Sequence, residues 1–229
     1  MAIAFGSHVL VSGVNGGTSA SQDTTGATLL VVCTCSAFGV TATVSDSKTN
    51  TWTPLTHFDG HTPHGRMFYV NNPTVGTGHT FTLGPAGVTG VGIFSWWSGA
   101  ATTSVLDQQN GLSGSPVPAQ PGSITPSEDG ELVVAGFASV TFTNPLAASG
   151  MTIIADQIVI GGQSYALAAA YVVQTTATAI NPTWSGMDSS QGANYLASFK
   201  AAAGAGPTVG DRIVRPRPLR NVGHPAYLS

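Results

Sequence analysis

Residues 28–32 read Thr-Leu-Leu-Val-Val, and residues 131–134 read Glu-Leu-Val-Val. Both runs are rich in branched apolar side chains, a pattern typical of strands that are buried on both faces. Residues 80–83, Thr-Phe-Thr-Leu, instead alternate polar with apolar side chains, as a half-buried strand does. These patterns predict an all-β fold built around two interior strands.

The segments that follow the two apolar runs are also alike. An aromatic-rich strand pattern follows each run after 38 or 39 residues, at 67–70 in one block and 170–173 in the other. A second aromatic segment comes next in each block, at 93–96 and 195–199, so the blocks repeat at an offset of about 102 residues. Two similar half-blocks predict a two-sheet antiparallel β-sandwich with a jelly-roll-like arrangement.

Short runs of Val, Ile, Thr, Phe and Tyr between turn residues mark the expected strands. These runs are 3–12, 28–37, 42–45, 52–58, 66–71, 79–83, 92–98, 131–138, 152–160, 165–173, 180–184 and 195–200. No segment has the periodicity of an amphipathic helix. Residues 108–127 begin Gln-Gln-Asn-Gly and contain four prolines, so they are predicted to be a loop that joins the two blocks.

The composition excludes several classes of protein. Charged residues make up 7% of the chain, against about 25% in ordinary globular proteins. Nucleic-acid binding depends on many Lys and Arg contacts to phosphate, so a nucleic acid is not expected as a partner. The hydrophobic fraction of 42% argues against disorder. The longest uncharged segments are broken by Gly, Pro and polar residues, so no membrane span is predicted.

The two cysteines and the N-terminal sequence indicate where the chain is made. Cys33 and Cys35 are two positions apart on an expected strand, so they share a face and are poorly placed to bond each other. They are predicted to be reduced, buried thiols, because no further cysteine completes a metal-ligand set. The first six residues lack the basic and apolar regions of a secretory signal. Synthesis in a reducing cytosol is therefore expected.

The C-terminal part of the chain differs from the rest. Residues 201–207 form an Ala/Gly linker pattern, and residues 201–229 carry four Arg and one Asp, a net charge of +3. Residues 1–200 carry three basic and nine acidic residues, a net charge of −6. We therefore expect a sandwich domain at 1–200 and an extended arm at 201–229. The residues expected to bind a partner subunit are Arg212, Arg215, Pro216, Arg217, Pro218, Arg220 and Tyr227.

One segment combines several possible metal ligands. Residues 57–64 read His-Phe-Asp-Gly-His-Thr-Pro-His, so His57, His61 and His64 lie near one carboxylate. Imidazole and carboxylate groups bind zinc and similar ions, but the segment would have to fold back on itself to bring them together. Its spacing matches no established ligand set, so solvated loop histidines are the main prediction, with a metal-dependent hydrolase as an alternative. No cofactor is expected.

Two further clusters invite a structural interpretation. Asp46 and Asn50 belong to a Ser-Asp-Ser-Lys-Thr-Asn-Thr-Trp turn, where their side chains can bond backbone groups and direct Trp52 inward. The acids at 128, 129 and 131 precede an expected strand, and they are predicted to be solvated there rather than paired for catalysis. The sequence contains no nucleophile elbow, phosphate-binding loop or dinucleotide fingerprint.

Adjacent tryptophans raise a second possible function. Trp96 and Trp97 lie on one expected strand and therefore face opposite sides of its sheet. We expect one of them in the core and the other, Trp97, exposed or in an interface. An exposed ring suits sugar stacking, so binding of a host surface glycan is the alternative function.

The order of turns and strands resembles small β-sandwich virion proteins of tailed bacteriophages and prophages. The resemblance spans roughly residues 25–200 and rests on segments 30–32, 44–53, 67–70, 80–83, 97–99 and 131–134. It implies a non-enzymatic virion component, such as a capsid decoration, head-fibre or tail-associated protein. The implied partners are the major capsid protein or another virion protein, with assembly as a homo-oligomer. The arm lies outside the resemblance.

Overall fold

A computed structural model of the chain describes residues 2–37, 39–59, 63–87, 89–114, 118–161, 163–187 and 192–204. Within these ranges the protein contains strands and no helix. The sheets are antiparallel and pack face to face, so the predicted all-β sandwich is confirmed. The jelly-roll-like arrangement remains a prediction.

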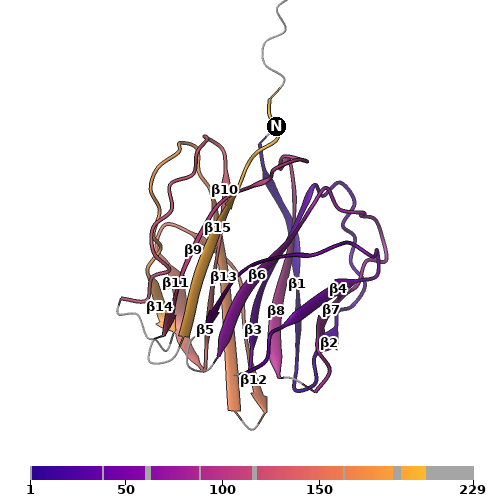
Figure 1. Cartoon of the computed structure of the whole chain (residues 1–229), viewed down its shortest axis with the longest axis vertical. Coiled ribbons are helices and arrows are strands. Elements are labelled where there is room, and N and C mark those ends of the chain that lie inside the picture. The colour runs from indigo at the N-terminus through magenta and orange to yellow at the C-terminus, as the bar shows by residue number, and fades with distance from the viewer. Residues whose placement is uncertain are drawn as a thin grey trace, which may run out of the picture.

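Two five-stranded sheets form the centre of the molecule (Figure 1). The first has the strand order β1-β8-β3-β6-β5, with β1 at Ala4–Gly13, β3 at Leu29–Ser36, β5 at Thr53–Asp59, β6 at His64–Asn71 and β8 at Gly90–Ser98. The second has the order β12-β13-β10-β15-β9, with β9 at Leu106–Gly114, β10 at Leu132–Ser139, β12 at Thr152–Gly161, β13 at Gln163–Val173 and β15 at Gly192–Phe199.

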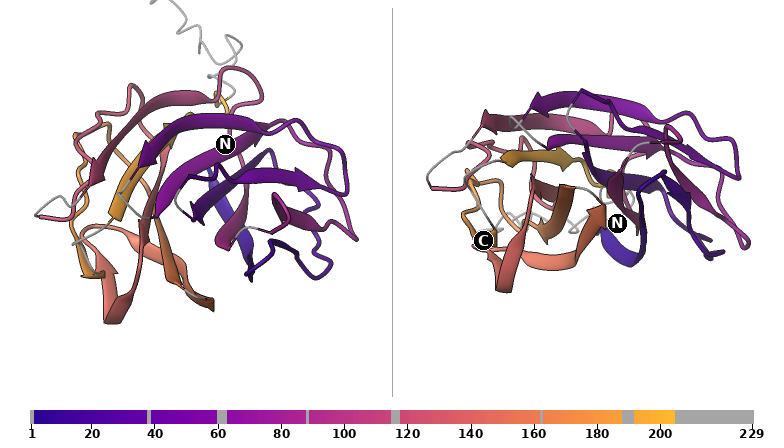
Figure 2. Two further views of the ribbon diagram at one scale, coloured as in Figure 1. Left: turned by 60° about the horizontal axis from the view of Figure 1, so that its bottom comes forward. Right: turned by 90° about the horizontal axis from the view of Figure 1, so that it is seen from below.

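Two small sheets cover the outer faces of the large ones (Figure 2). The first small sheet has the order β2-β7-β4, with β2 at Gly17–Thr18, β4 at Thr43–Asp46 and β7 at Phe81–Gly84. The second pairs β11, Phe142–Ala148, with β14, Trp184–Met187. Each large sheet is therefore covered on both faces. This explains why β3 and β10 are buried at every position and carry continuous apolar runs.

The hydrophobic core has three parts. The central cluster lies between the two large sheets and contains Trp97 and Tyr195. The first outer cluster joins Trp96, Phe81 and other residues beneath the first small sheet. The second outer cluster lies between the second large sheet and the pair β11 and β14, and it includes Trp184 of β14. Adjacent residues on a strand therefore serve different clusters, as strand geometry requires.

The two halves of the chain have the same topology. Strands β1, β3, β4, β5, β6, β7 and β8 correspond in order and pairing to β9, β10, β11, β12, β13, β14 and β15. Leu29 lies opposite Trp97 and Asn71, and Leu132 lies opposite Phe199 and Val173. The repeat predicted from the sequence thus corresponds to two structural units whose large sheets face each other. Below, the first half means β1–β8 and the second half means β9–β15.

The irregularities of the strands repeat as well. A bulge interrupts β1 between Phe5 and Ser7, and the pairing of β9 with β15 shifts at the corresponding place. A second bulge interrupts β5 after Pro54, and its counterpart interrupts β12 after Ile153. The residues that follow, Leu55 and Ile154, both point into the central cluster. Matching bulges fix which residues of the two halves are equivalent.

Three details of the sequence prediction are wrong. Residues 106–114, largely assigned to a loop, form β9, an edge strand that pairs with β15. Strands β2 and β11 were not predicted. The strand expected at 180–184 begins at Trp184, and Ile180 makes only an isolated bridge with Ile124. The polar residues of β9 are compatible with an edge strand because Gln108 and Asn110 hydrogen-bond to the carbonyls of Thr125 and Ser123.

Candidate functional site

The histidine–aspartate cluster, consisting of His57, Asp59 and His64, is the main candidate site. Strand β5 ends at Asp59, and β6 begins at His64, which lies directly opposite Asp59 in the pairing of the two strands. His57 lies two residues before Asp59 on the same face of β5. The hairpin thus supplies the fold-back that the sequence segment needed.

The three side chains converge on one carboxylate oxygen. Asp59 Oδ1 lies 3.4 Å from His57 Nε2 and 3.4 Å from His64 Nδ1. The two imidazole rings meet edge to face, with their centroids 4.8 Å apart. All three ligand atoms lie within 4.8 Å of one another. The cluster therefore has the donor set and the proximity of a metal site.

Neighbouring elements hold the cluster in position. The Asp59 backbone N–H donates to Ser113 Oγ of β9 at 2.9 Å, and the Thr56 N–H donates to Gln109 Oε1 at 3.0 Å. His64 is buried and accepts a long hydrogen bond of 3.4 Å from the Gly39 N–H at Nε2. Burial lowers the pKa of His57, because loss of solvent disfavours its charged form, although the Asp59 carboxylate acts in the opposite direction.

The predicted group of three histidines is only partly described. His57 and His64 are brought together, whereas His61 lies outside the described residues. Among the described residues, the third member of the group is Asp59. The sequence segment contained this carboxylate, but only the hairpin pairing shows which residues converge.

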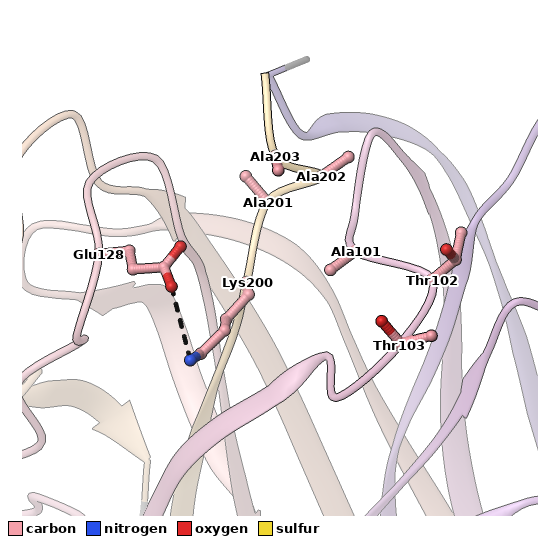
Figure 3. A pocket seen from close by; sticks show the side chains of 8 residues that line it. All are labelled: Ala101, Thr102, Thr103, Glu128, Lys200, Ala201, Ala202 and Ala203. Carbon is pink, nitrogen blue, oxygen red and sulfur yellow. Dashed lines mark ion pairs between the residues drawn. The ribbon is translucent and has the colours of Figure 1, made fainter. Parts of the chain in front are cut away.

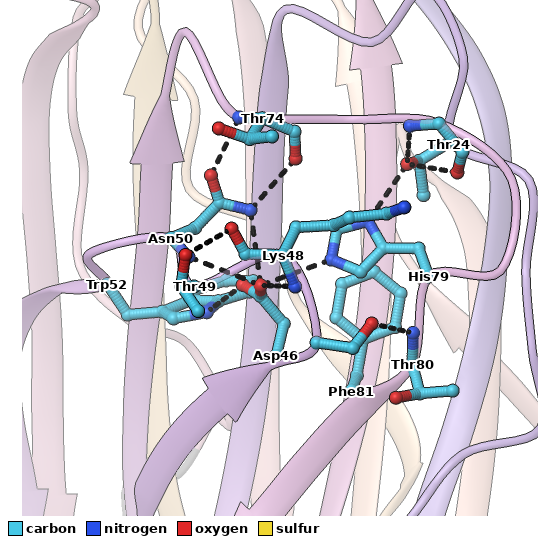
Figure 4. A network of polar contacts seen from close by, with 12 residues as sticks. Thr24, Asp46, Lys48, Thr49, Asn50, Trp52, Thr74, His79, Thr80 and Phe81 are labelled. Carbon is cyan, nitrogen blue, oxygen red and sulfur yellow. Dashed lines mark hydrogen bonds and ion pairs between the residues drawn. The ribbon is translucent and has the colours of Figure 1, made fainter.

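A second polar cluster surrounds Asp46 and forms a buried corner of the first half (Figure 4). Asp46 Oδ2 accepts a hydrogen bond of 2.7 Å from Trp52 Nε1. Asp46 Oδ1 accepts one of 2.8 Å from the Lys48 N–H and lies 3.3 Å from His79 Nε2. Asn50 connects the corner to Thr74 through its amide group. The predicted structural turn and the inward direction of Trp52 are thereby confirmed.

The Asp46 corner also contains a Thr–His–Asp arrangement. Thr24 Oγ1 lies 2.9 Å from His79 Nδ1, on the opposite side of the ring from Asp46. A hydroxyl, an imidazole and a carboxylate in a row can provide a nucleophile and its base. Thr24 and His79 are both 0% exposed, however, and Thr24 also bonds to the backbone of Gly76. With no access for a substrate, this arrangement holds loops together.

A pocket of about 450 Å³ lies where β15 leaves the sandwich (Figure 3). Lys200 crosses one side, with Nζ 3.6 Å from Glu128 and 3.5 Å from Asp107. Thr102, Thr103 and four alanines form the rest of the lining. Because Lys200 is paired with two carboxylates, it anchors the chain rather than offering a free cation to a ligand.

The acids that precede β10 are not all solvated, as the sequence had suggested. Glu131 is 0% exposed, and its Oε1 accepts hydrogen bonds from the Glu128 N–H at 3.0 Å and Ser127 Oγ at 3.3 Å. Burial raises its pKa, and nearby Asp107 acts in the same direction. The prediction of a solvated cluster is therefore wrong for Glu131, which closes the turn instead.

The expected exposure of Trp97 is also wrong. Trp97 is 0% exposed, and its Nε1 donates to Ser95 Oγ at 3.0 Å within the central cluster. Trp96 does face the opposite side, but it is only 6% exposed because the first small sheet covers it. Neither ring offers a face to a sugar, so the glycan-binding interpretation loses the residue on which it rested.

The remaining sequence predictions concern the cysteines, membrane spans and the C-terminal arm. Cys33 and Cys35 are free and buried as predicted, and burial raises the pKa of the Cys33 thiol to about 12. No helix in the described ranges is long and apolar enough to cross a membrane. The arm residues Arg212, Arg215, Pro216, Arg217, Pro218, Arg220 and Tyr227 lie outside the described residues.

The chain was also compared with known proteins. No family model, no curated protein and no solved structure matches it.

Proposed function

We propose that the protein is a non-enzymatic structural component of a bacteriophage particle. In this proposal it is a capsid decoration or head-associated protein, made in the host cytoplasm and assembled as a homo-oligomer. Residues 201–229 attach it to the major capsid protein or to another virion protein. The proposal rests on the resemblance of the strand pattern and on the contacts that hold residues 200–202 where the chain leaves the sandwich.

The way in which residues 200–202 are held against the sandwich is the observation that supports the proposal. Ala201 forms a bridge with Ala100, and the Ala202 N–H donates to the Gly99 carbonyl at 2.8 Å. The ion pairs of Lys200 hold the preceding residue. The described chain ends at residue 204, at the same end of the sandwich as the N-terminus (Figure 1). Residues 200–202 thus form a fixed point on the sandwich from which the arm begins.

The charge of that segment suggests what would hold it. Residues 201–229 carry +3, whereas residues 1–200 carry −6. Guanidinium groups form paired hydrogen bonds with carboxylates, and prolines lower the conformational entropy lost on docking. An acidic groove on a neighbouring subunit is the surface that such an arm would fit.

The first test is quantitative mass spectrometry of purified particles from the source. Many copies per particle, in a fixed ratio to the major capsid protein, are expected of a decoration protein. A few copies would move the protein to a fibre or tail, and its absence from particles would overturn the proposal.

A deletion separates the arm from the domain. A chain that ends at residue 204 is expected to melt at the same temperature as the full chain but to be lost from particles. The matched control keeps the length and replaces Arg212, Arg215, Arg217 and Arg220 by Gln. If both variants are incorporated normally, the arm does not attach the protein.

A further inference from the structure

We propose that the histidine–aspartate cluster binds one divalent transition-metal ion, with zinc as the best match to its ligands. The ligand atoms are His57 Nε2, Asp59 Oδ1 and His64 Nδ1. Two imidazoles and one carboxylate are a donor set that zinc and its neighbours in the periodic table accept. Three protein ligands leave a fourth position for water. This proposal is independent of the virion role.

The distances in the cluster favour an ion over direct hydrogen bonds. Charge-assisted hydrogen bonds between nitrogen and a carboxylate measure about 2.7–2.9 Å. Both nitrogen–oxygen distances here are 3.4 Å, so the carboxylate lies farther from each ring than in a charge-assisted hydrogen bond. Zinc bonds of about 2.0–2.1 Å in a tetrahedron place neighbouring ligand atoms about 3.4 Å apart. The two nitrogen–oxygen spacings therefore match two edges of a tetrahedral zinc site, and the three ligand atoms all lie within 4.8 Å of one another, so binding needs a small inward shift of the two rings.

The second half of the chain shows that the fold does not need these residues. The equivalent hairpin of β12 and β13 has the same register and the same bulge as β5 and β6. At the positions of His57, Asp59 and His64 it carries Asp156, Ile158 and Ala166. The hairpin thus forms without any histidine, and the cluster is an addition specific to the first half.

The cluster combines a fixed position with access from solvent. The side chains of His57 and Asp59 are 26% and 60% exposed, so an ion can reach them, whereas His64 is 8% exposed and held by its surroundings. Coordination through Nδ1 places the ring proton on Nε2, which gives up the Gly39 contact. At 3.4 Å that hydrogen bond is long, so little is lost.

The one basic side chain near the cluster among the described residues is Arg66, whose positive charge helps to lower the pKa of His57. Arg66 lies directly opposite His57, but its Nε donates to the Leu55 carbonyl at 2.8 Å and its guanidinium lies 5.3 Å from the Phe68 ring centre. Among the described residues, the ion pairs of Asp59 are those with the two imidazoles. The carboxylate is thus available to neutralise part of the charge of a bound cation.

The test is a calorimetric titration of the full, tag-free chain with zinc chloride after treatment with a chelator. We expect one zinc ion per chain, together with a rise in melting temperature, because a ligand that binds only the folded state stabilises it. Cobalt(II) in place of zinc is expected to give the visible absorption of a tetrahedral site. Absence of stoichiometric zinc binding by the native chain would overturn the proposal.

Variants show whether these residues are the ligands. H57A and D59N are each expected to weaken zinc binding at least about tenfold, since even indirect partners of a metal contribute that much. Both side chains are partly exposed, so the metal-free melting temperature of each variant is expected to match that of the native chain. H8A removes a histidine of β1 outside the cluster and is expected to bind zinc normally. Equal binding by H57A and the native chain would assign the zinc to another site.

Discussion

The two halves of this protein have one fold and different chemistry. Both have the same strand order, the same paired bulges and the same place for a small covering sheet. Yet five of the six histidines lie in the first half, and the segment from 106 to 204 contains none. The comparison shows that the fold depends on the apolar pattern. The histidine–aspartate cluster and the Asp46 corner are additions to it.

One polar feature does belong to the shared fold. In the first half the Ser47 N–H donates to the Thr80 carbonyl, and the Thr80 N–H donates back to Ser47 Oγ, each at 2.9 Å. In the second half Ser149 and Thr183 make the same two hydrogen bonds at 3.0 and 2.8 Å. These reciprocal bonds connect β4 to β7 and β11 to β14, so they stabilise the small sheets in both halves.

In the central cluster, equivalent positions of the two halves hold side chains of different size. Tyr195 pairs with Gly136 on the neighbouring strand and packs over Gly65 of the facing sheet. A Cβ added at Gly136 would lie 2.4 Å from the tyrosine ring, and one added at Gly65 would lie 2.5 Å from it. The equivalent positions in the other half hold Ile93, Cys33 and Leu167. One large and two small residues thus replace three residues of medium size. The total volume is shared differently on the two sides of the core.

The largest expected effect on stability comes from enlarging one of the two glycines that make room for the Tyr195 ring. Gly65→Leu installs the residue of the second half at a position that the Tyr195 ring occupies. Overpacking of a closed core is expected to cost about 3 kcal/mol of the free energy of unfolding, the upper end of the usual range, because the added side chain meets a buried ring. Urea denaturation measures this cost, and a variant that fails to fold agrees with it.

A rescue experiment tests the equivalence itself. Combining Gly65→Leu with Tyr195→Ile and Gly136→Cys reproduces the set of residues found in the other half. We expect the triple variant to be more stable than Gly65→Leu alone, because the three positions share one volume. Part of the loss remains, since Tyr195 also donates a hydrogen bond of 2.8 Å to the Thr34 carbonyl. A triple variant as unstable as the single one would disprove the exchange.

Much of this fold could be predicted from the sequence, for a physical reason. Strands buried on both faces, such as β3 and β10, carry continuous apolar runs because neither of their faces contacts solvent. The same reasoning failed at β9, because an edge strand that is partly exposed has no need of apolar residues. It failed at Trp97 because a sequence pattern gives the direction of a side chain but not the sheet that covers it.

The sequence could predict which residue types the candidate site contains, but not which of those residues lie close together. The segment around His57 contains the ligand types, but their convergence depends on the pairing of Asp59 with His64 across the hairpin. The contacts of Ser113 and Gly39 with the cluster come from distant segments and have no local signal. The Thr24–His79–Asp46 contacts likewise join residues that only the folded chain brings together.

A smaller effect is expected from Asp46→Ala, which gives the first half the alanine that the second half has at position 148. The change removes the acceptor of Trp52 Nε1 and leaves His79 beside an apolar group. Loss of buried hydrogen bonds to a charged acceptor is expected to cost about 2 kcal/mol, measured by urea denaturation. Asp23→Ala is the control, because Asp23 is exposed and bonds only locally to Thr25. Equal stability of the two variants would contradict a structural role for the corner.

The smallest expected effect is a difference in acid sensitivity between the halves. Burial lowers the pKa of His57 and His79 from the ordinary 6.5, so in acid the unfolded chain binds more protons than the folded one. The free energy of unfolding of the first half therefore falls as the pH drops through 6.5 toward the lower folded values. Glu131, whose pKa is raised from 4.5, acts in the opposite direction in the second half.

Hydrogen exchange in the presence of a chelator measures the acid response of each half separately. Between pH 7 and pH 5, once the intrinsic pH dependence of exchange is corrected, β3 and β6 are expected to lose protection while β10 and β13 keep theirs. His79→Gln, which keeps a polar side chain without a titrating group, is expected to reduce the pH dependence of the first half. Equal loss of protection in both halves that is unchanged in His79→Gln would mean that His79 does not set the acid response. Equal loss that His79→Gln reduces would mean that the two large sheets unfold as one unit, because a cooperative sandwich transmits a local loss across its central cluster.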